Sequence, residues 1–460
     1  MAGSVRLGAA PAAVLALLVL ATTGCLRGAG AGDGDGPLAG ATVEVAAIWT
    51  GAEQAHFQAV LAAFERRTGA TVRYTSGGDD LPALLNSRLA GGAPPDVALL
   101  GQPGVVAQLA RRGELTELSG AAAAAAAAAA ANFSPPWREF GMVDGRLYGV
   151  YFKVANKSVI WYRTDAFQQA GVEPPRSWPE LVRVTGTLAD AGVGTMAVPG
   201  ADGWVLTDWF ENIYLRTAGP ARYDQLARHE IGWTDPSVVG ALALLRDYWT
   251  LDRAIQDHPL QLKFVQAVAD VFGGRPKSAM LFQADFVAAE INRLGTVAVG
   301  EGARFFDWPS IGGSPPAVVT AGDQAVSLTG TPAALALIAY LASPEAAEIA
   351  ARQGGFLSAN RNLPPSAYPD PVSRELAESL VGAELLRFDL SDLTPQAFGG
   401  GTNASMWRLL QDFLAEPDDP AGLAARLEAA AERAFGCPSA PDRCAGGCPP
   451  MAGSCPDGSG

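Results

Sequence analysis

Apolar and polar positions along the early part of the chain predict strands and helices in alternation. Thr42–Ile48 alternates β-branched and small residues, as a half-buried strand would. Gln54–Arg67 is expected to be a helix because its apolar residues fall at helical spacing, namely Phe57, Val60, Leu61 and Phe64. Further elements are predicted in the order strand, helix, strand, helix at Thr71–Thr75, Leu81–Leu89, Asp96–Leu100 and Val105–Arg112. This alternation predicts an α/β lobe with a mostly parallel sheet.

A second series of elements begins near Tyr148. Val159–Tyr162 predicts a strand and Asp165–Ala170 a helix. Ser177-Trp178-Pro179-Glu180 has the spacing of a capping box at the start of a helix. In a capping box the Ser and Glu side chains each accept a hydrogen bond from the other residue's backbone amide. Later strands are expected at Ser278–Phe282 and Ala325–Leu328, and later helices at Pro332–Ala342, Pro344–Gln353 and Ala404–Phe435.

The first residues have the layout of a secretory signal. Arg6 supplies positive charge, and the apolar run that follows is too short to span a bilayer as a helix. Thr22-Thr23-Gly24-Cys25 resembles a bacterial lipobox, in which the cysteine is lipidated, although Leu is usual where Thr22 stands. We expect residues 1–24 to be a signal peptide and Cys25 to carry a lipid, with an ordinary cleaved signal as the alternative.

Composition indicates a globular protein of two domains or lobes. Apolar residues make up 49% and charged residues 17% of the 460 residues. The net charge is −14, or −15 without Arg6, and this argues against nucleic acid, which requires a clustered basic surface. After the lipidated N-terminus, the rest of residues 25–40 is rich in Gly and is expected to form a flexible tether to the membrane.

Residues 437–460 are expected to form a cysteine-rich tail outside the main body. Its four cysteines favour two disulfides in an oxidising compartment, with three possible pairings: Cys437, Cys444, Cys448 and Cys455. Zinc is the alternative, but the tail has no paired Cys-x2-Cys motif.

Common catalytic motifs are missing from the sequence. It contains no Gly-x-Ser-x-Gly, no His-Glu-x-x-His and no Walker loop, and His56, His229 and His258 are too scattered to predict a metal site. We therefore expect no catalytic residues, no metal and no cofactor. A secreted glycoside hydrolase, which would use two carboxylates, is the enzymatic alternative.

Six segments occur in an order that is typical of one family: Trp49–Glu53, Gly91–Val97, Tyr148–Tyr162, Pro174–Leu181, Gly203–Glu211 and Leu341–Ala346. Over residues 41–436 the chain resembles family 1 extracellular solute-binding proteins of the ABC carbohydrate-uptake type, near those for α-glucosides and other oligosaccharides. The resemblance implies a two-lobe, type II periplasmic-binding-protein-like α/β fold. Each lobe would have a mostly parallel sheet flanked by helices, and the two lobes would close around a ligand.

The resemblance also implies where the lobes begin and end. Residues 41–149 and 312–357 would form the first lobe, and residues 150–311 and 358–436 the second. The chain would then cross between lobes near residues 150, 312 and 358.

Candidate ligand contacts in the first lobe follow predicted strands, where loops of open parallel sheets bind ligands. Trp49 could stack on a sugar ring, and Glu53 and Gln102 could pair with hydroxyls. The alternative for Glu53 is structural, because Thr50 and Glu53 have the spacing of a capping box. Gln102 could equally belong to a plain turn.

The other candidates lie near the expected crossings or in the second lobe. They are Lys153 and Asn156 at the first crossing, Trp204 and Asp208 at the start of a helix, Asp285 after a strand, and Asp323 near the second crossing. Trp204 and Asp208 would share one helical face, whereas Trp209 would face the core. The alternative is a helix packed by its aromatic residues.

The expected function is capture of a neutral sugar by lobe closure, followed by delivery to an ABC permease at the outer face of the cytoplasmic membrane. The chain is expected to act as a lipid-anchored monomer. A different solute, such as a polyol, a sugar-phosphate ester or a polyamine, is the alternative ligand.

Overall fold

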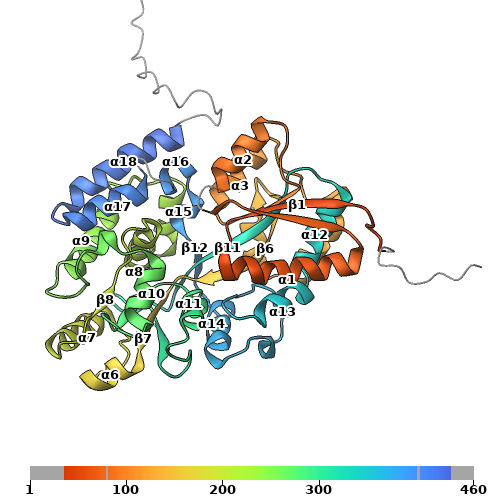
Figure 1. The fold of residues 1–460 in the computed structure, drawn as a ribbon. Helices are drawn as coiled ribbons and strands as arrows, with labels where there is room; N and C mark the ends of the chain where they lie inside the picture. Colours follow the sequence, from red (N-terminus) through yellow and green to blue (C-terminus); the bar gives the residue numbers. More distant parts are fainter. Residues whose placement is uncertain (1–35, 79–80, 401–404, 437–460) are drawn as a thin grey trace, which may run out of the picture.

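The computed structural model describes residues 36–78, 81–400 and 405–436 of the chain. Two sheets with flanking helices form two lobes, one on the right and one on the left of Figure 1, joined through β6, β11 and β12. The expected two-lobe α/β fold is therefore confirmed. The expected signal peptide, Cys25, most of the tether and the four tail cysteines lie outside the described residues.

The larger sheet belongs to the first lobe and has the strand order β12-β11-β3-β1-β2, with β6 also paired to β11. Its strands are β1 (Thr42–Ala47), β2 (Thr71–Ser76), β3 (Val97–Leu100), β6 (Gly149–Asn156), β11 (Val318–Ser327) and β12 (Leu386–Phe388). The pairings β1 with β2, β1 with β3 and β11 with β12 are parallel, whereas β11 is antiparallel to β3 and β6.

Helices cover the larger sheet because each has an apolar face. These are α1 (Gly51–Thr68), α2 (Leu81–Ala90), α3 (Pro103–Arg111), α4 (Ala123–Asn132), α12 (Pro332–Leu341) and α13 (Pro344–Ala351). In α1 the predicted apolar residues Phe57, Val60, Leu61 and Phe64 are all buried in the core. Between α4 and β6 lie the short elements α5 (Pro135–Phe140), β4 (Met142–Val143) and β5 (Arg146–Leu147).

The smaller sheet has the order β10-β7-β9-β8, with strands β7 (Val159–Arg163), β8 (Met196–Ala197), β9 (Met280–Phe282) and β10 (Ala303–Asp307). Only the pair β8 and β9 is parallel, so this sheet is mixed rather than mostly parallel as expected. The reason is topological: β7 leads away from the larger sheet and the neighbouring β10 leads back to it, so the two run in opposite directions.

Further helices are α6 (Thr164–Ala170), α7 (Trp178–Asp190), α8 (Trp204–Ala227), α9 (Pro236–Trp249), α10 (Phe264–Phe272), α11 (Val287–Leu294), α14 (Pro371–Val381), α15 (Leu390–Leu393), α16 (Gln396–Gly399), α17 (Met406–Ala415) and α18 (Pro420–Gly436). Of these, α6 and α10 contact strands of the smaller sheet, whereas α14 contacts β6 of the larger sheet. The capping box of Ser177 and Glu180 is confirmed at the start of α7. Helix α8 is broken near its end, where Gly219 adopts a left-handed φ of 80° before Pro220.

Strand membership places the crossings between the lobes. Strand β6 stays in the larger sheet to Asn156 and β7 begins at Val159, so the chain leaves the larger sheet at 157–158, later than the expected 150. It returns between Asp307 and Val318, which includes the expected 312. Near residue 358, the third expected point, the chain still contacts the larger sheet. It pairs with that sheet again in β12 and enters the second lobe only at α15.

Within the described part of the chain, no single helix is both long and apolar enough to cross a membrane. By length and composition alone, α12 and α13 would meet that test together, although they are bent by 62° at their junction.

Trp209 is the centre of the aromatic core of the second lobe. Its ring is fully buried and lies 5.4 Å from Tyr248, 5.0 Å from Phe282 and 5.1 Å from Trp308. Trp209→Ala should lower the free energy of unfolding by about 3–5 kcal/mol, because it leaves a large cavity. Urea denaturation followed by circular dichroism measures this loss. Trp204→Ala, on the same helix but partly exposed, should cost less, and equal losses would contradict the core position of Trp209.

Candidate functional site

A cleft of about 360 Å³ lies between the lobes, at the carboxyl ends of β1 and β3. Ligands of open α/β sheets bind at this edge. A second hollow, of about 1450 Å³, is lined by Pro174, Asp307 and Glu384 among others and lies away from these strand ends. The smaller cleft is the candidate site because it gathers most of the predicted residues.

The first lobe supplies a polar wall. Glu53 lies in the first turn of α1, Gln102 directly precedes α3, and Lys153 and Asp323 face each other across the ladder of β6 and β11. The ammonium of Lys153 donates a hydrogen bond to Glu53. Thr50 makes no side-chain capping bond, so the Glu53 carboxylate serves this ion pair instead of the capping box that its spacing allowed.

A β-bulge sets the direction of the two central residues of this wall. The register of β6 and β11 shifts between Asp323 and Gln324, so that Lys153 is opposite Asp323 and Tyr151 is opposite Gln324. Bulges commonly redirect a side chain next to a binding site. Lys153 Nζ also lies 5.8 Å from the centre of the Trp49 ring, which forms part of the same wall.

The second lobe supplies an aromatic wall, which we define as Trp204, Phe264, Phe286 and Trp407. The rings of Trp204, Phe264 and Phe286 lie 5.5–6.1 Å from one another. Trp407 approaches closely because residue 203 is glycine: a Cβ at Gly203 would lie 2.6 Å from Trp407 Cβ. The charged groups Glu53, Lys153 and Asp323 therefore lie on the first-lobe side together with Trp49, and the other rings lie on the second-lobe side, where Asp392 also lines the cleft.

Burial shifts the protonation of the carboxyls around Lys153. It raises the pKa of Asp323 to about 6 and that of Asp285 to about 7, and the Lys153 charge offsets part of each shift. For Lys153 burial acts to lower the pKa, but Glu53 and Asp323 outweigh it and raise the pKa above its usual value. The lysine is therefore charged at neutral pH.

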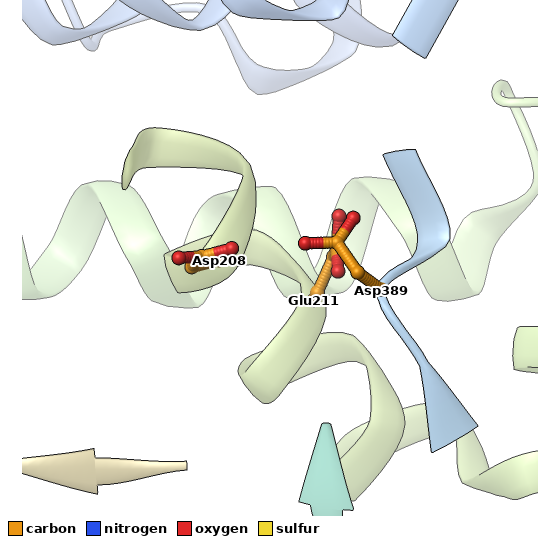
Figure 2. Close-up of side chains that lie close together, drawn as sticks. All are labelled: Asp208, Glu211 and Asp389. Carbon is orange, nitrogen blue, oxygen red and sulfur yellow. The ribbon is translucent and has the colours of Figure 1, made fainter. Parts of the chain in front are cut away.

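Behind the cleft lies a cluster of buried carboxyls. One ligand atom from each of Asp208, Glu211 and Asp389 lies within 4.8 Å of the others, and Figure 2 shows the three side chains together. Lys157 Nζ lies 3.0 Å from Asp208 Oδ1 and 2.5 Å from Asp389 Oδ2. The lysine thus pairs with two of the three carboxyls, Asp208 and Asp389.

The structure brings six of the nine predicted residues to the cleft wall: Trp49, Glu53, Gln102, Lys153, Trp204 and Asp323. The other three, Asn156, Asp208 and Asp285, are buried behind it. Asp285 Oδ1 accepts a hydrogen bond of 2.7 Å from the backbone amide of Asn156, and Asp208 binds Lys157 and Gln283. Trp209 faces the core, as predicted.

Among the charged and aromatic residues of the cleft, sequence reasoning missed five: Lys157, Phe264, Phe286, Asp392 and Trp407. Two of them had a signal, since Lys157 adjoins the candidate Asn156 and Phe286 adjoins the candidate Asp285. Phe264 and Trp407 lie in the first turns of helices that no motif marks, and only the folded chain brings them to Trp204.

Comparison with known proteins now identifies the family. The pattern of the bacterial extracellular solute-binding proteins matches residues 49–348. The chain belongs to this family. Two curated relatives cover 82% of this solute-binding protein: the osmoprotective compounds-binding protein GgtB of Synechocystis, 33% identical over 89% of its own length, and the alpha-glucosides-binding periplasmic protein AglE of Rhizobium meliloti, 32% identical over 84%.

Solved structures agree on the fold of this solute-binding protein. The bacterial solute receptor AcbH, described as having an exclusive preference for β-D-galactopyranose, matches with a TM-score of 0.74 at 19% identity, over 86% of this chain and 99% of the receptor. A chitin oligosaccharide binding protein also matches at 0.74, with 20% identity, over 88% of this chain and its entire length.

The buried Asp208 predicts a pH dependence of stability. Burial, partly offset by Lys157 and reinforced by Asp389, raises the pKa of Asp208 to about 7 from its ordinary 3.8. Between about pH 4 and 7 the folded protein holds a proton there that the unfolded chain has released, so this contribution to stability falls as pH rises. In Asp208→Asn the unfolding free energy should fall less steeply with pH, by an amount that corresponds to up to about one bound proton. Urea denaturation at several pH values measures this slope. An unchanged slope would contradict the assignment.

Proposed function

We propose that this solute-binding protein captures a carbohydrate in the inter-lobe cleft and delivers it to an ABC importer without chemical change. The observation that carries the proposal is the contrast between the two walls. A sugar has hydroxyl groups around its edge and apolar C–H groups on its ring faces. Glu53, Lys153 and Asp323 can pair with hydroxyls through charge-assisted hydrogen bonds, while Trp204 and Trp407 can cover a ring face.

The size of the cleft favours a short ligand. Its volume of about 360 Å³ is near the lower end of the roughly 300–1,000 Å³ range of small-molecule pockets. This volume supports a mono- or disaccharide rather than a long oligosaccharide.

Lobe closure is the proposed mechanism of capture. The polar wall and the aromatic wall belong to different lobes, so a ligand that contacts both stabilises the closed arrangement by its higher affinity for that arrangement. The importer would then recognise the closed protein. The two curated relatives are named for binding osmoprotective compounds and alpha-glucosides. These names support a glycoside or a related polyhydroxy solute as the ligand.

The location follows from the family and the N-terminal sequence. The family is extracellular, and Thr22-Thr23-Gly24-Cys25 supports a lipid anchor on Cys25 after removal of residues 1–24. We propose that the body acts as a monomer on the outer face of the cytoplasmic membrane, held by the Gly-rich tether. The four tail cysteines would be paired as two disulfides in this oxidising environment.

Calorimetric titration with glucose, galactose, maltose, trehalose, sucrose and glucosylglycerol tests the proposal. At least one should bind saturably and raise the melting temperature, since a ligand at 100 times its Kd adds about 2.7 kcal/mol to stability. Trp204→Ala should weaken binding about tenfold through loss of ring contact. The control Trp233→Phe, in the core of the second lobe, should bind like the wild type.

Two results would contradict the proposal. The first is that none of the six compounds binds. The second is that the purified protein cleaves a glycoside it binds, measured as new reducing ends by chromatography, because a delivery protein must release its ligand intact.

A further inference from the structure

Helix α8 carries a stripe of buried polar residues along one side. Asp208, Glu211, Asn212 and Arg216 follow at helical spacing and lie on one face. All four are at most 7% exposed, and apart from Thr207 the other buried residues of this helix are aromatic or aliphatic. Buried polar side chains are costly unless they are paired, so the partners of this stripe identify what it does.

The first crossing between the lobes, Lys157 and Ser158, binds two members of the stripe. Lys157 Nζ lies 3.0 Å from Asp208 Oδ1, and Ser158 Oγ donates a hydrogen bond of 2.6 Å to Asn212 Oδ1. The Asn212 amide in turn donates to the Lys157 carbonyl at 2.9 Å. Side chains and backbone of this crossing are therefore both held by α8.

The second crossing, which leads into β11, binds the same stripe. Arg216 donates a hydrogen bond of 2.6 Å to the Ala317 carbonyl and also binds Asn212 Oδ1 at 3.0 Å. Ser158 Oγ accepts the amide of Val319 at 2.8 Å, which connects the first crossing to the second.

The third crossing runs from β12 into α15. Glu211 accepts the amides of Leu390 at 2.9 Å and Ser391 at 3.0 Å, and so caps the first turn of α15. Asp389, one residue earlier, binds Lys157. Further along α8, Tyr223 donates to the Phe388 carbonyl at 3.0 Å. Each of the three crossings is thus bound to one helix of the second lobe.

The same helix is part of the ligand cleft. Trp204, in the aromatic wall, lies one turn before Asp208 on α8, and Lys157 Nζ lies 5.7 Å from the centre of the Trp204 ring. Lys157 itself also lines the cleft. A shift of α8 relative to the crossings would therefore change the distance between the aromatic wall and the polar wall.

The carboxyls of Asp208, Glu211 and Asp389 are close enough to suggest a metal site (Figure 2). Their hydrogen bonds argue for a different role. Lys157 donates to Asp208 and Asp389, and the amides of α15 donate to Glu211, so each carboxyl already has donors from a crossing.

We propose that Asp208, Glu211, Asn212 and Arg216 are positioning residues that fix all three inter-lobe crossings to the second lobe, so that α8 sets the resting distance and orientation between the two walls of the cleft. The inference rests on lobe closure as part of the proposed function. It concerns the ligand-free protein, however, and can be tested without a sugar.

Double electron–electron resonance on the full chain measures the inter-lobe distance distribution. Spin labels attached through genetically encoded ketone residues at Arg66 on α1 and Arg426 on α18 leave the native cysteines untouched; both positions are exposed. Wild type should give one narrow distribution without ligand. Asp208→Asn and Asn212→Ala should each at least double its width, because each releases part of a crossing from α8.

Thr185→Val is the matched control. Thr185 is buried in the second lobe and shares a hydrogen bond with the Tyr248 hydroxyl, which the variant loses. This hydrogen bond involves none of the three crossings. The variant should lower the melting temperature without broadening the distribution.

Equal broadening in the control, or an unchanged width in both stripe variants, overturns the inference. Asn212→Ala changes no charge and decides the question alone if Asp208→Asn fails to fold. Absence of sugar binding would contradict the proposed function but not this result.

Discussion

The ammonium of Lys157, buried between Asp208 and Asp389, is the interaction on which the arrangement of the lobes depends. The three residues come from the first crossing, from α8 and from the third crossing. Removing one partner of a buried ion pair typically costs about 3–5 kcal/mol, because a charge is left unpaired. Lys157 therefore joins segments far apart in the sequence at the point where the chain leaves the larger sheet, and the cleft opens directly beside it.

The unlike walls of the cleft follow from how each lobe is built. In the first lobe, strands end at the cleft, and the segments after them carry Glu53 in the first turn of α1 and Gln102 directly before α3. A bulge in β6 places Lys153 opposite Asp323. In the second lobe, Trp204, Phe264 and Trp407 stand in the first turns of three helices. The first lobe thus offers charged groups beside Trp49 and the second lobe offers mainly aromatic rings, which suits an amphipathic ring such as a sugar.

The periodicity of the sequence predicted the first lobe well, because its strands and helices alternate and Phe57, Val60 and Leu61 mark one helical face. Trp49, Glu53 and Gln102 were found by the rule that side chains after parallel strands meet at one sheet edge. The other three cleft residues were found from their places near the expected crossings or at the start of a helix. Such sequence positions could not distinguish a residue in the cleft from one a turn behind it. Asp208 is a residue of the type that binds hydroxyl groups, but in the folded chain it is paired with the buried Lys157. That pairing depends on tertiary structure and could not be predicted from the sequence.

The central claim is that a small sugar lies between the polar and aromatic walls, held beside the crossings that α8 fixes. A crystal structure of the protein with the sugar that binds most tightly tests it directly. The account predicts one sugar in the cleft, with a ring face on Trp204 or Trp407 and hydroxyls bonded to Glu53, Lys153 or Asp323. A sugar bound instead in the larger hollow near Asp307 and Glu384 would contradict it.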